Sequence, residues 1–112
     1  MSKITFAELP EFRKDLKKLV KKYPSLLRDL ELRKQVLEIF PQGRGMDVDE
    51  IPGLKIKNKI YKTRIVCAYL KRDSLRLIYC YDKEESLIIL IEIYFKGEQI
   101  LENRERILAN FN

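Results

Sequence analysis

Two cations interrupt a segment that otherwise has the composition of a β-strand. Residues 60–67 read IYKTRIVC, with Lys62 and Arg64 among β-branched and aromatic residues. Because successive side chains of a strand point to opposite faces, Lys62 and Arg64 share one face. Uncompensated charge is costly to bury, so this face is predicted to be open to solvent or to an anionic ligand.

The next two apolar segments, residues 75–81 and 87–94, add polar groups to the same predicted face. Alternation places Arg76 with Ile78 and Cys80, and Glu92 with Tyr94. The opposite face is predicted to carry the core, and it comprises Tyr61, Thr63, Ile65, Cys67, Leu75, Leu77, Tyr79, Tyr81, Leu87, Ile89, Ile91 and Ile93.

The predicted open face gathers polar side chains that suit a phosphodiester: Lys62, Arg64, Arg76, Glu92 and Tyr94. Clustered cations hold a phosphate and stabilise the charge that grows in its transition state. Arginine offers a planar fork to phosphate oxygens, whereas lysine is a point charge. Tyr94 is suited to stacking on a base or donating a hydrogen bond. Glu92 has two interpretations, an acid/base group or an ion-pair partner of Arg64 or Arg76, and the second is favoured.

Composition narrows the class of protein. The chain has 112 residues, which fits one domain over 1–112, and a net charge of +6, which indicates a polyanionic partner such as nucleic acid or else a lysine-rich solvated surface. It has no histidine, the commonest acid/base group and metal ligand, so we expect neither a metal nor a cofactor. Cys67 and Cys80 are predicted to be buried thiols on opposite sides of the sheet.

The preceding chain is predicted to supply the scaffold. Residues 3–7 alternate as a strand, and residues 10–23 form a helix with a basic outer face. Ser25 is the predicted N-cap of a second helix that ends before Pro41, so the two helices form an antiparallel hairpin. Residues 42–53 are predicted to be a loop, in which Gly43-Arg44-Gly45 is interpreted as a turn and not as a phosphate loop.

The fold class is therefore predicted to be α+β: an N-terminal strand, an αα-hairpin, a three-stranded antiparallel meander and a C-terminal helix within residues 102–111, in the order β-α-α-β-β-β-α. The hairpin is predicted to cover one face of the sheet and to leave the other face free. Lys55, Lys57 and Lys59 precede the meander and are predicted to bind RNA.

At this point the sequence resembles the RelE/ParE superfamily, the toxins of toxin–antitoxin pairs, over nearly its whole length. The resemblance is closest to the RelE and HigB branches, and it rests on the order and spacing of three motifs: Tyr61-Lys62-Thr63-Arg64, Leu75-Arg76-Leu77-Ile78-Tyr79 and Ile93-Tyr94-Phe95-Lys96-Gly97-Glu98. Lys62, Arg64 and Arg76 match basic residues of the family, and Lys96 matches the lysine that follows the last strand. Gly97, Asn103 and Phe95 stand where some relatives carry arginine, tyrosine and histidine.

The resemblance implies a ribosome-dependent mRNA endonuclease that uses no metal. In such toxins the ribose 2′-hydroxyl attacks the scissile phosphate, and the partners are mRNA, the ribosome and a cognate antitoxin. The alternatives are a ParE-like inhibitor of DNA gyrase without nuclease activity, and a catalytically degenerate member that only binds its antitoxin. An acidic antitoxin is expected to cover the helical hairpin or the open face. The N-terminus has no apolar signal segment, and no run spans a bilayer, so we expect a cytoplasmic protein with no membrane partner.

Overall fold

The computed structural model describes residues 3–111, apart from the side chains of residues 73 and 74, so both ends of the domain predicted over 1–112 lie outside the described residues. The structure confirms the predicted α+β class. The elements in chain order are β1 (Thr5–Glu8), α1 (Pro10–Lys22), α2 (Leu26–Ile39), β2 (Val48–Glu50), β3 (Ile60–Cys67), β4 (Arg72–Asp82), β5 (Leu87–Phe95) and α3 (Arg104–Asn110). Within residues 3–111, no helix combines the length and apolarity that crossing a bilayer requires.

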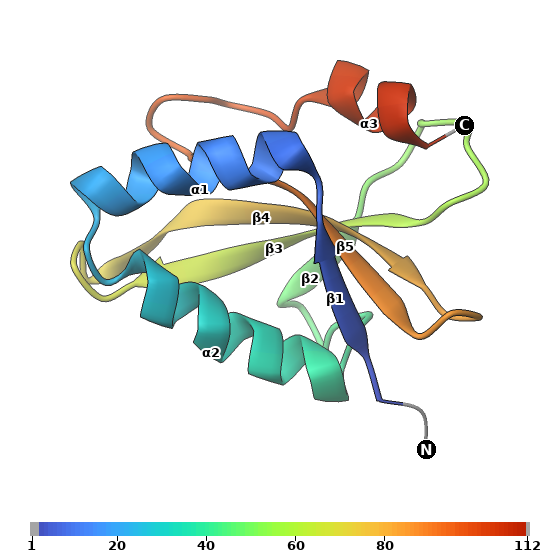
Figure 1. Cartoon of the computed structure of the whole chain (residues 1–112), viewed down its shortest axis with the longest axis horizontal. Coiled ribbons are helices and arrows are strands. Elements are labelled where there is room, and N and C mark those ends of the chain that lie inside the picture. Colours follow the sequence, from blue (N-terminus) through green and yellow to red (C-terminus); the bar gives the residue numbers. More distant parts are fainter. Residues whose placement is uncertain (1–2, 112) are drawn as a thin grey trace.

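One five-stranded sheet forms the centre of the molecule, with the strand order β1-β5-β4-β3-β2 (Figure 1). β1 pairs in parallel with β5, while β3, β4 and β5 form the predicted antiparallel meander. β2 lies within residues 42–53, for which the sequence predicts only a loop, and it pairs with the first half of β3. The turn predicted before it is confirmed. Gly43 has a φ of 90°, and a Cβ atom there would lie 2.5 Å from the Cβ of Val48.

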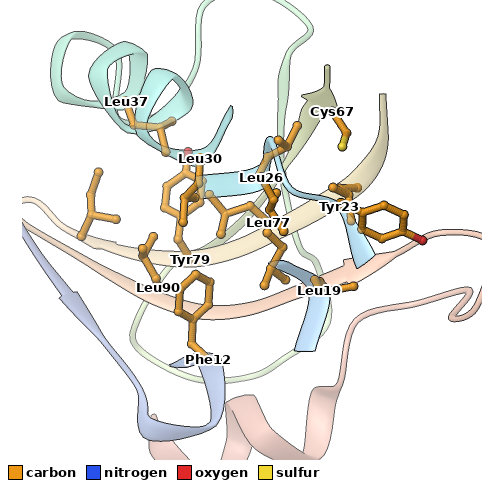
Figure 2. Packing of buried hydrophobic residues seen from close by; sticks show 14 of the residues in the cluster. Phe12, Leu19, Tyr23, Leu26, Leu30, Leu37, Cys67, Leu77, Tyr79 and Leu90 are labelled. Carbon is orange, nitrogen blue, oxygen red and sulfur yellow. The ribbon is translucent and has the colours of Figure 1, made fainter. Parts of the chain in front are cut away.

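The helical hairpin packs on one face of the sheet, as predicted. α1 begins at Pro10, where a missing N–H costs nothing. Side chains of α1 and α2 point at strand residues in the cluster of Figure 2, which labels Phe12, Leu19, Tyr23, Leu26, Leu30, Leu37, Cys67, Leu77, Tyr79 and Leu90. Fully burying one such leucine or phenylalanine stabilises the fold by about 1.5–3 kcal/mol.

Ser25 occupies the N-cap position of α2, but its side chain makes no capping hydrogen bond. Its hydroxyl donates to Asp29 Oδ2 (2.7 Å) and accepts from the Tyr69 amide (2.9 Å). The second bond fastens α2 to the β3–β4 turn. The cap predicted at this residue is therefore replaced by a tertiary contact, in which the hydroxyl pairs with a backbone amide of the nearby turn.

The opposite face of the sheet is not free, and that prediction is wrong. A second apolar cluster covers much of it, with Ile107 and Phe111 of the C-terminal segment packed over Ile78 and Cys80. α3 lies beside α1 (Figure 1), and Arg106 Nη1 donates to Asp15 Oδ2 at 2.7 Å across the gap. A sheet with two apolar faces needs two covering layers.

A bulge in β5 changes which of its residues face the hairpin. Ile78 pairs with Glu92 and the next residue, Tyr79, pairs with Leu90, so Ile91 is the extra residue. Ile88 and Leu90 therefore pack under the hairpin, in place of the predicted Leu87, Ile89 and Ile91, while Ile93 does so as predicted. Cys67 and Cys80 are buried free thiols in different clusters, which confirms that they lie on opposite faces.

Candidate active site

Arg64, Arg76 and Tyr94 form one row across three neighbouring strands. Arg64 of β3 pairs with Arg76 of β4, and Arg76 pairs with Tyr94 of β5. Directly opposite residues of antiparallel strands have Cβ atoms about 4.5–5.5 Å apart, so these side chains meet on one face. Lys62 lies two residues before Arg64 and projects from the same face. The alternation of the strands therefore groups the predicted cations.

These side chains line a pocket of about 200 Å³. Lys96 and Ile100, from the segment after β5, line it as well. The full set is Met46, Asp47, Asp49, Lys62, Thr63, Arg64, Arg76, Tyr94, Lys96 and Ile100. All the predicted catalytic residues except Glu92 are thus brought together around one pocket.

Two carboxylates that the sequence analysis missed share this pocket with the four cations. Asp49 of β2 lies opposite Lys62 in the ladder, and Asp47 pairs with Arg33 at 3.5 Å. The polar–apolar–polar run Asp47-Val48-Asp49 is the signal of a short strand that could have located them. Four cations against two carboxylates leave a positive excess of two, which suits one phosphodiester and its growing transition-state charge.

Tyr94 supplies a phenol that stays protonated. Its side chain is 5% exposed, so the prediction that it lies on an open surface is wrong, although it does line the pocket. Burial, with smaller contributions from the negative charges of Glu102 and Glu92, raises the pKa of Tyr94 to about 12, and the nearby Arg76 opposes this rise. At neutral pH the hydroxyl is therefore a hydrogen-bond donor to a ligand and not a base.

A pH titration of stability tests this environment. Because the pKa of Tyr94 in the folded protein, about 12, lies above the unfolded value of about 10, ionisation favours unfolding in this range. We expect the contribution of Tyr94 to be complete below about pH 10 and to be lost as the pH rises towards about 12. Urea denaturation at a series of pH values should show a steeper fall for the wild type than for Tyr94→Phe. Parallel curves would contradict the raised pKa.

Lys62 is held by a buried carboxylate that no sequence signal indicated. Its Nζ donates to Glu102 Oε1 at 3.2 Å, and Arg104 Nε donates to Glu102 Oε2 at the same distance. Burial opposes the ionisation of Glu102, but hydrogen bonds from its own backbone amide and from Lys62, with the charges of Lys62 and Arg104, keep its pKa below the ordinary value. Glu102 is therefore a carboxylate at neutral pH.

Glu92 lies behind the pocket and does not line it. Its side chain is buried, and its two oxygens accept hydrogen bonds of 2.7 Å from Gln99 Nε2 and from the Asn103 amide. Both donors belong to the segment that joins β5 to α3. Glu92 therefore anchors this segment, and the prediction that its side chain sits on an open face is wrong, because the segment folds over it.

The three lysines predicted to bind RNA do not reach the pocket. Lys55, Lys57 and Lys59 are exposed in the irregular segment that leads into β3. They stand on the surface before the strand that carries Lys62 and Arg64. The predicted contact of these lysines with RNA would therefore lie outside the pocket.

Strand order, helical hairpin and C-terminal helix together define a RelE-like fold. A chain of the crystal structure of the archaeal RelE–RelB complex from Pyrococcus horikoshii OT3 is similar to this chain with a TM-score of 0.61, over 88% of this chain and 100% of that one. The two sequences are 18% identical, so this likeness establishes the fold alone. No protein-family model and no curated protein sequence matches the chain.

Proposed function

We propose that this chain is the toxin of a toxin–antitoxin pair and an endoribonuclease that cuts mRNA on translating ribosomes in the cytoplasm. The observation that carries the proposal is the pocket in which Lys62, Arg64, Arg76 and Lys96 converge beside the protonated Tyr94, on a RelE-like fold. The whole chain acts as one toxin domain in this proposal.

RNA carries its own nucleophile, so the protein needs only to hold and polarise the phosphate. The 2′-oxygen forms a bond to phosphorus while the bond between phosphorus and the 5′-oxygen breaks. The 2′-hydroxyl proton leaves to solvent, and the 5′-oxygen takes up a proton. The products are a 2′,3′-cyclic phosphate and a 5′-hydroxyl. Arg64 and Arg76 bind the non-bridging oxygens, and Tyr94 donates a hydrogen bond to charge that grows on the phosphate.

Exposed lysines outside the pocket extend its positive field. Lys55, Lys57 and Lys59 are proposed to contact RNA phosphates on either side of the cut, with affinity that falls as salt rises. Such contacts carry no sequence information, so they position the strand without selecting a codon.

Mapping of RNA 5′ ends tests the function directly. Induced expression of the chain should arrest growth and create new mRNA ends bearing a 5′-hydroxyl, and the purified protein should cut mRNA in a translation extract. Cleavage should require translating ribosomes. Growth arrest without new ends, together with inhibited supercoiling by purified DNA gyrase, would replace this proposal with the ParE-like alternative.

The antitoxin is proposed to cover the outer side of α2. Leu32, Val36 and Ile39 recur at helical spacing and are exposed, Ile39 by 71%. β2 pairs with β3 only as far as Thr63, and among the described residues no strand pairs with the edge of β3 beyond it, next to this stripe. An apolar stripe beside an open strand edge suits a partner that adds a strand or an apolar helix. The net charge of +6 favours an acidic partner.

Charge placed on this stripe should separate neutralisation from toxicity. We expect Leu32→Glu to weaken binding of the protein encoded next to this gene by about 30-fold or more, because a central apolar contact is worth about 2 kcal/mol. Toxicity should persist, since Leu32 lies on the far side of the sheet from the pocket. The matched control is Leu108→Glu on α3, where the leucine is 43% exposed. Calorimetric titration gives both affinities, and equal values would exclude α2 as the interface.

A further inference from the structure

The segment between β5 and α3 places one buried carboxylate directly against the cationic pocket. Glu102 is 7% exposed and lies 40 residues along the chain from Lys62. One of its oxygens accepts a hydrogen bond of 3.2 Å from the Lys62 ammonium. Its second oxygen accepts from Arg104, whose Nη1 also donates to the carbonyl of Pro52 at 3.1 Å. Glu102 therefore faces Lys62, Arg104 and the phenol of Tyr94, and it lines an adjoining pocket together with Asp49 and Glu50.

Burying a carboxylate is costly, so its place beside a pocket residue calls for a reason. Docking of the C-terminal segment does not require it. Ile107 and Phe111 are buried against the sheet, and Arg106 binds Asp15 at 2.7 Å and the carbonyl of Ile91 at 2.9 Å. Glu102 does not line the cationic pocket, although it lines the adjoining pocket that shares Lys62 with it. Of its two cationic partners, Lys62 and Arg104, Lys62 is the one that lines the cationic pocket.

We infer that Glu102 is a positioning residue that fixes the ammonium of Lys62 for a phosphate in the pocket. This inference rests on the proposed function. A lysine ammonium has three donors on a flexible four-carbon stem. Fixing that stem in one conformation costs about 2 kcal/mol of side-chain entropy. Glu102 accepts one donor and stops the rotation before a ligand arrives, which leaves two donors for phosphate oxygens. Asp49, opposite Lys62 on β2, is exposed and cannot hold the ammonium from the buried side.

The inference predicts an effect opposite in sign to simple electrostatics. Removing a negative charge near a phosphate site should strengthen binding of RNA if Glu102 acts only through its charge. If it positions Lys62, Glu102→Ala should weaken binding. Glu102→Gln should retain most of the affinity, because its amide oxygen still accepts from the ammonium.

A double-mutant cycle with Lys62→Ala isolates this effect. The probe is a 2′-O-methyl oligoribonucleotide, which carries the phosphates but lacks the nucleophile, so binding is measured whether or not the chain cleaves RNA. We expect Lys62→Ala and Glu102→Ala each to weaken binding about 5- to 20-fold. Glu102→Ala should have no further effect in the Lys62→Ala background. The matched control is Glu105→Ala, the same chemical change as Glu102→Ala on an exposed residue of α3.

Cleavage measured with the same variants separates the two proposals. If the wild type cleaves mRNA and the cycle shows coupling, kcat should fall with Glu102→Ala and recover with Glu102→Gln. Coupling without cleavage would overturn the nuclease and leave the positioning role intact. Additive losses, or tighter binding by Glu102→Ala, would overturn the positioning role even in an active nuclease.

Discussion

Replacing Arg76 by alanine is expected to lower the kcat of RNA cleavage by about 100- to 1000-fold, the loss that follows removal of one donor aimed at transition-state charge. Arg76 occupies the centre of the row, opposite Arg64 on one side and Tyr94 on the other. It lies on β4, the central strand of the meander, and lines the pocket. Among the described residues that line the pocket, Arg76 is the one whose ladder partners on both sides, Arg64 and Tyr94, also line it.

Arg76→Lys separates charge from geometry. Lysine retains the positive charge but lacks the planar fork that binds two phosphate oxygens at once, so activity should fall between wild type and Arg76→Ala. The control is Lys83→Ala in the exposed β4–β5 hairpin, which removes one cation far from the pocket. Single-turnover cleavage in a translation extract gives the rates, and circular dichroism checks the fold. Wild-type activity in Arg76→Ala would mean that the pocket is not the cleavage site.

In β3 and β4 of the meander, strand alternation correctly predicts which residues face the helical hairpin. β3 and β4 have one apolar face and one mixed face, and the hairpin buries the apolar one. A slip of one residue would have buried Lys62 and Arg64, so the pattern determines the facing of these strands. This is why the grouping of Arg64 with Arg76, which depends only on alternation and antiparallel pairing, agrees with the structure.

The facing of the β5 residues could not be predicted in this way, because the first part of its sequence does not alternate between apolar and polar residues. Residues 87–91 are all apolar, and such a run fits a strand buried on both faces in any register. The bulge at Ile91 therefore has no signature in the sequence. The apolar run was nevertheless a sign that both faces of the sheet are covered. The C-terminal residues Ile107 and Phe111 supply the second cover, and this removes Tyr94 and Glu92 from the surface.

Contacts between distant parts of the chain could not be predicted from sequence patterns. Glu102 meets Lys62 only because the segment after β5 turns back across the sheet, and a single carboxylate in a polar run gives no sign of burial. Two neutral donors, Gln99 and the backbone of Asn103, hold that turn in place. The shared face of Lys62, Arg64 and Arg76 was thus predictable from periodicity, whereas the contact between Lys62 and Glu102 depends on tertiary structure.

Glu92→Ala is expected to lower the free energy of unfolding by about 3–6 kcal/mol, although Glu92 does not line the pocket. A hydrogen bond to a charged group contributes about 1.5–3 kcal/mol, and Glu92 accepts two from the segment that joins β5 to α3. Both bonds are 2.7 Å and involve a side chain that is 3% exposed. The alanine variant also removes the acceptor of the partly buried hydrogen bond that the Asn103 amide donates.

Glu92→Gln should recover only part of this stability. Its amide group has one acceptor oxygen, so one of the two donors meets an N–H group and loses its bond. The control is Glu84→Gln in the exposed β4–β5 hairpin, for which no change is expected. Urea denaturation gives the free energies, and hydrogen exchange locates the loss.

Where the loss is located decides between two roles for Glu92. If it anchors the segment, exchange should rise first in residues 96–103, and RNA binding should weaken because Glu102 no longer reaches Lys62. The helical hairpin should keep its protection, since its core lies on the other face of the sheet. Full stability in Glu92→Ala together with lost cleavage would instead assign Glu92 to the chemistry, as an acid/base group reached by rearrangement of the segment above it.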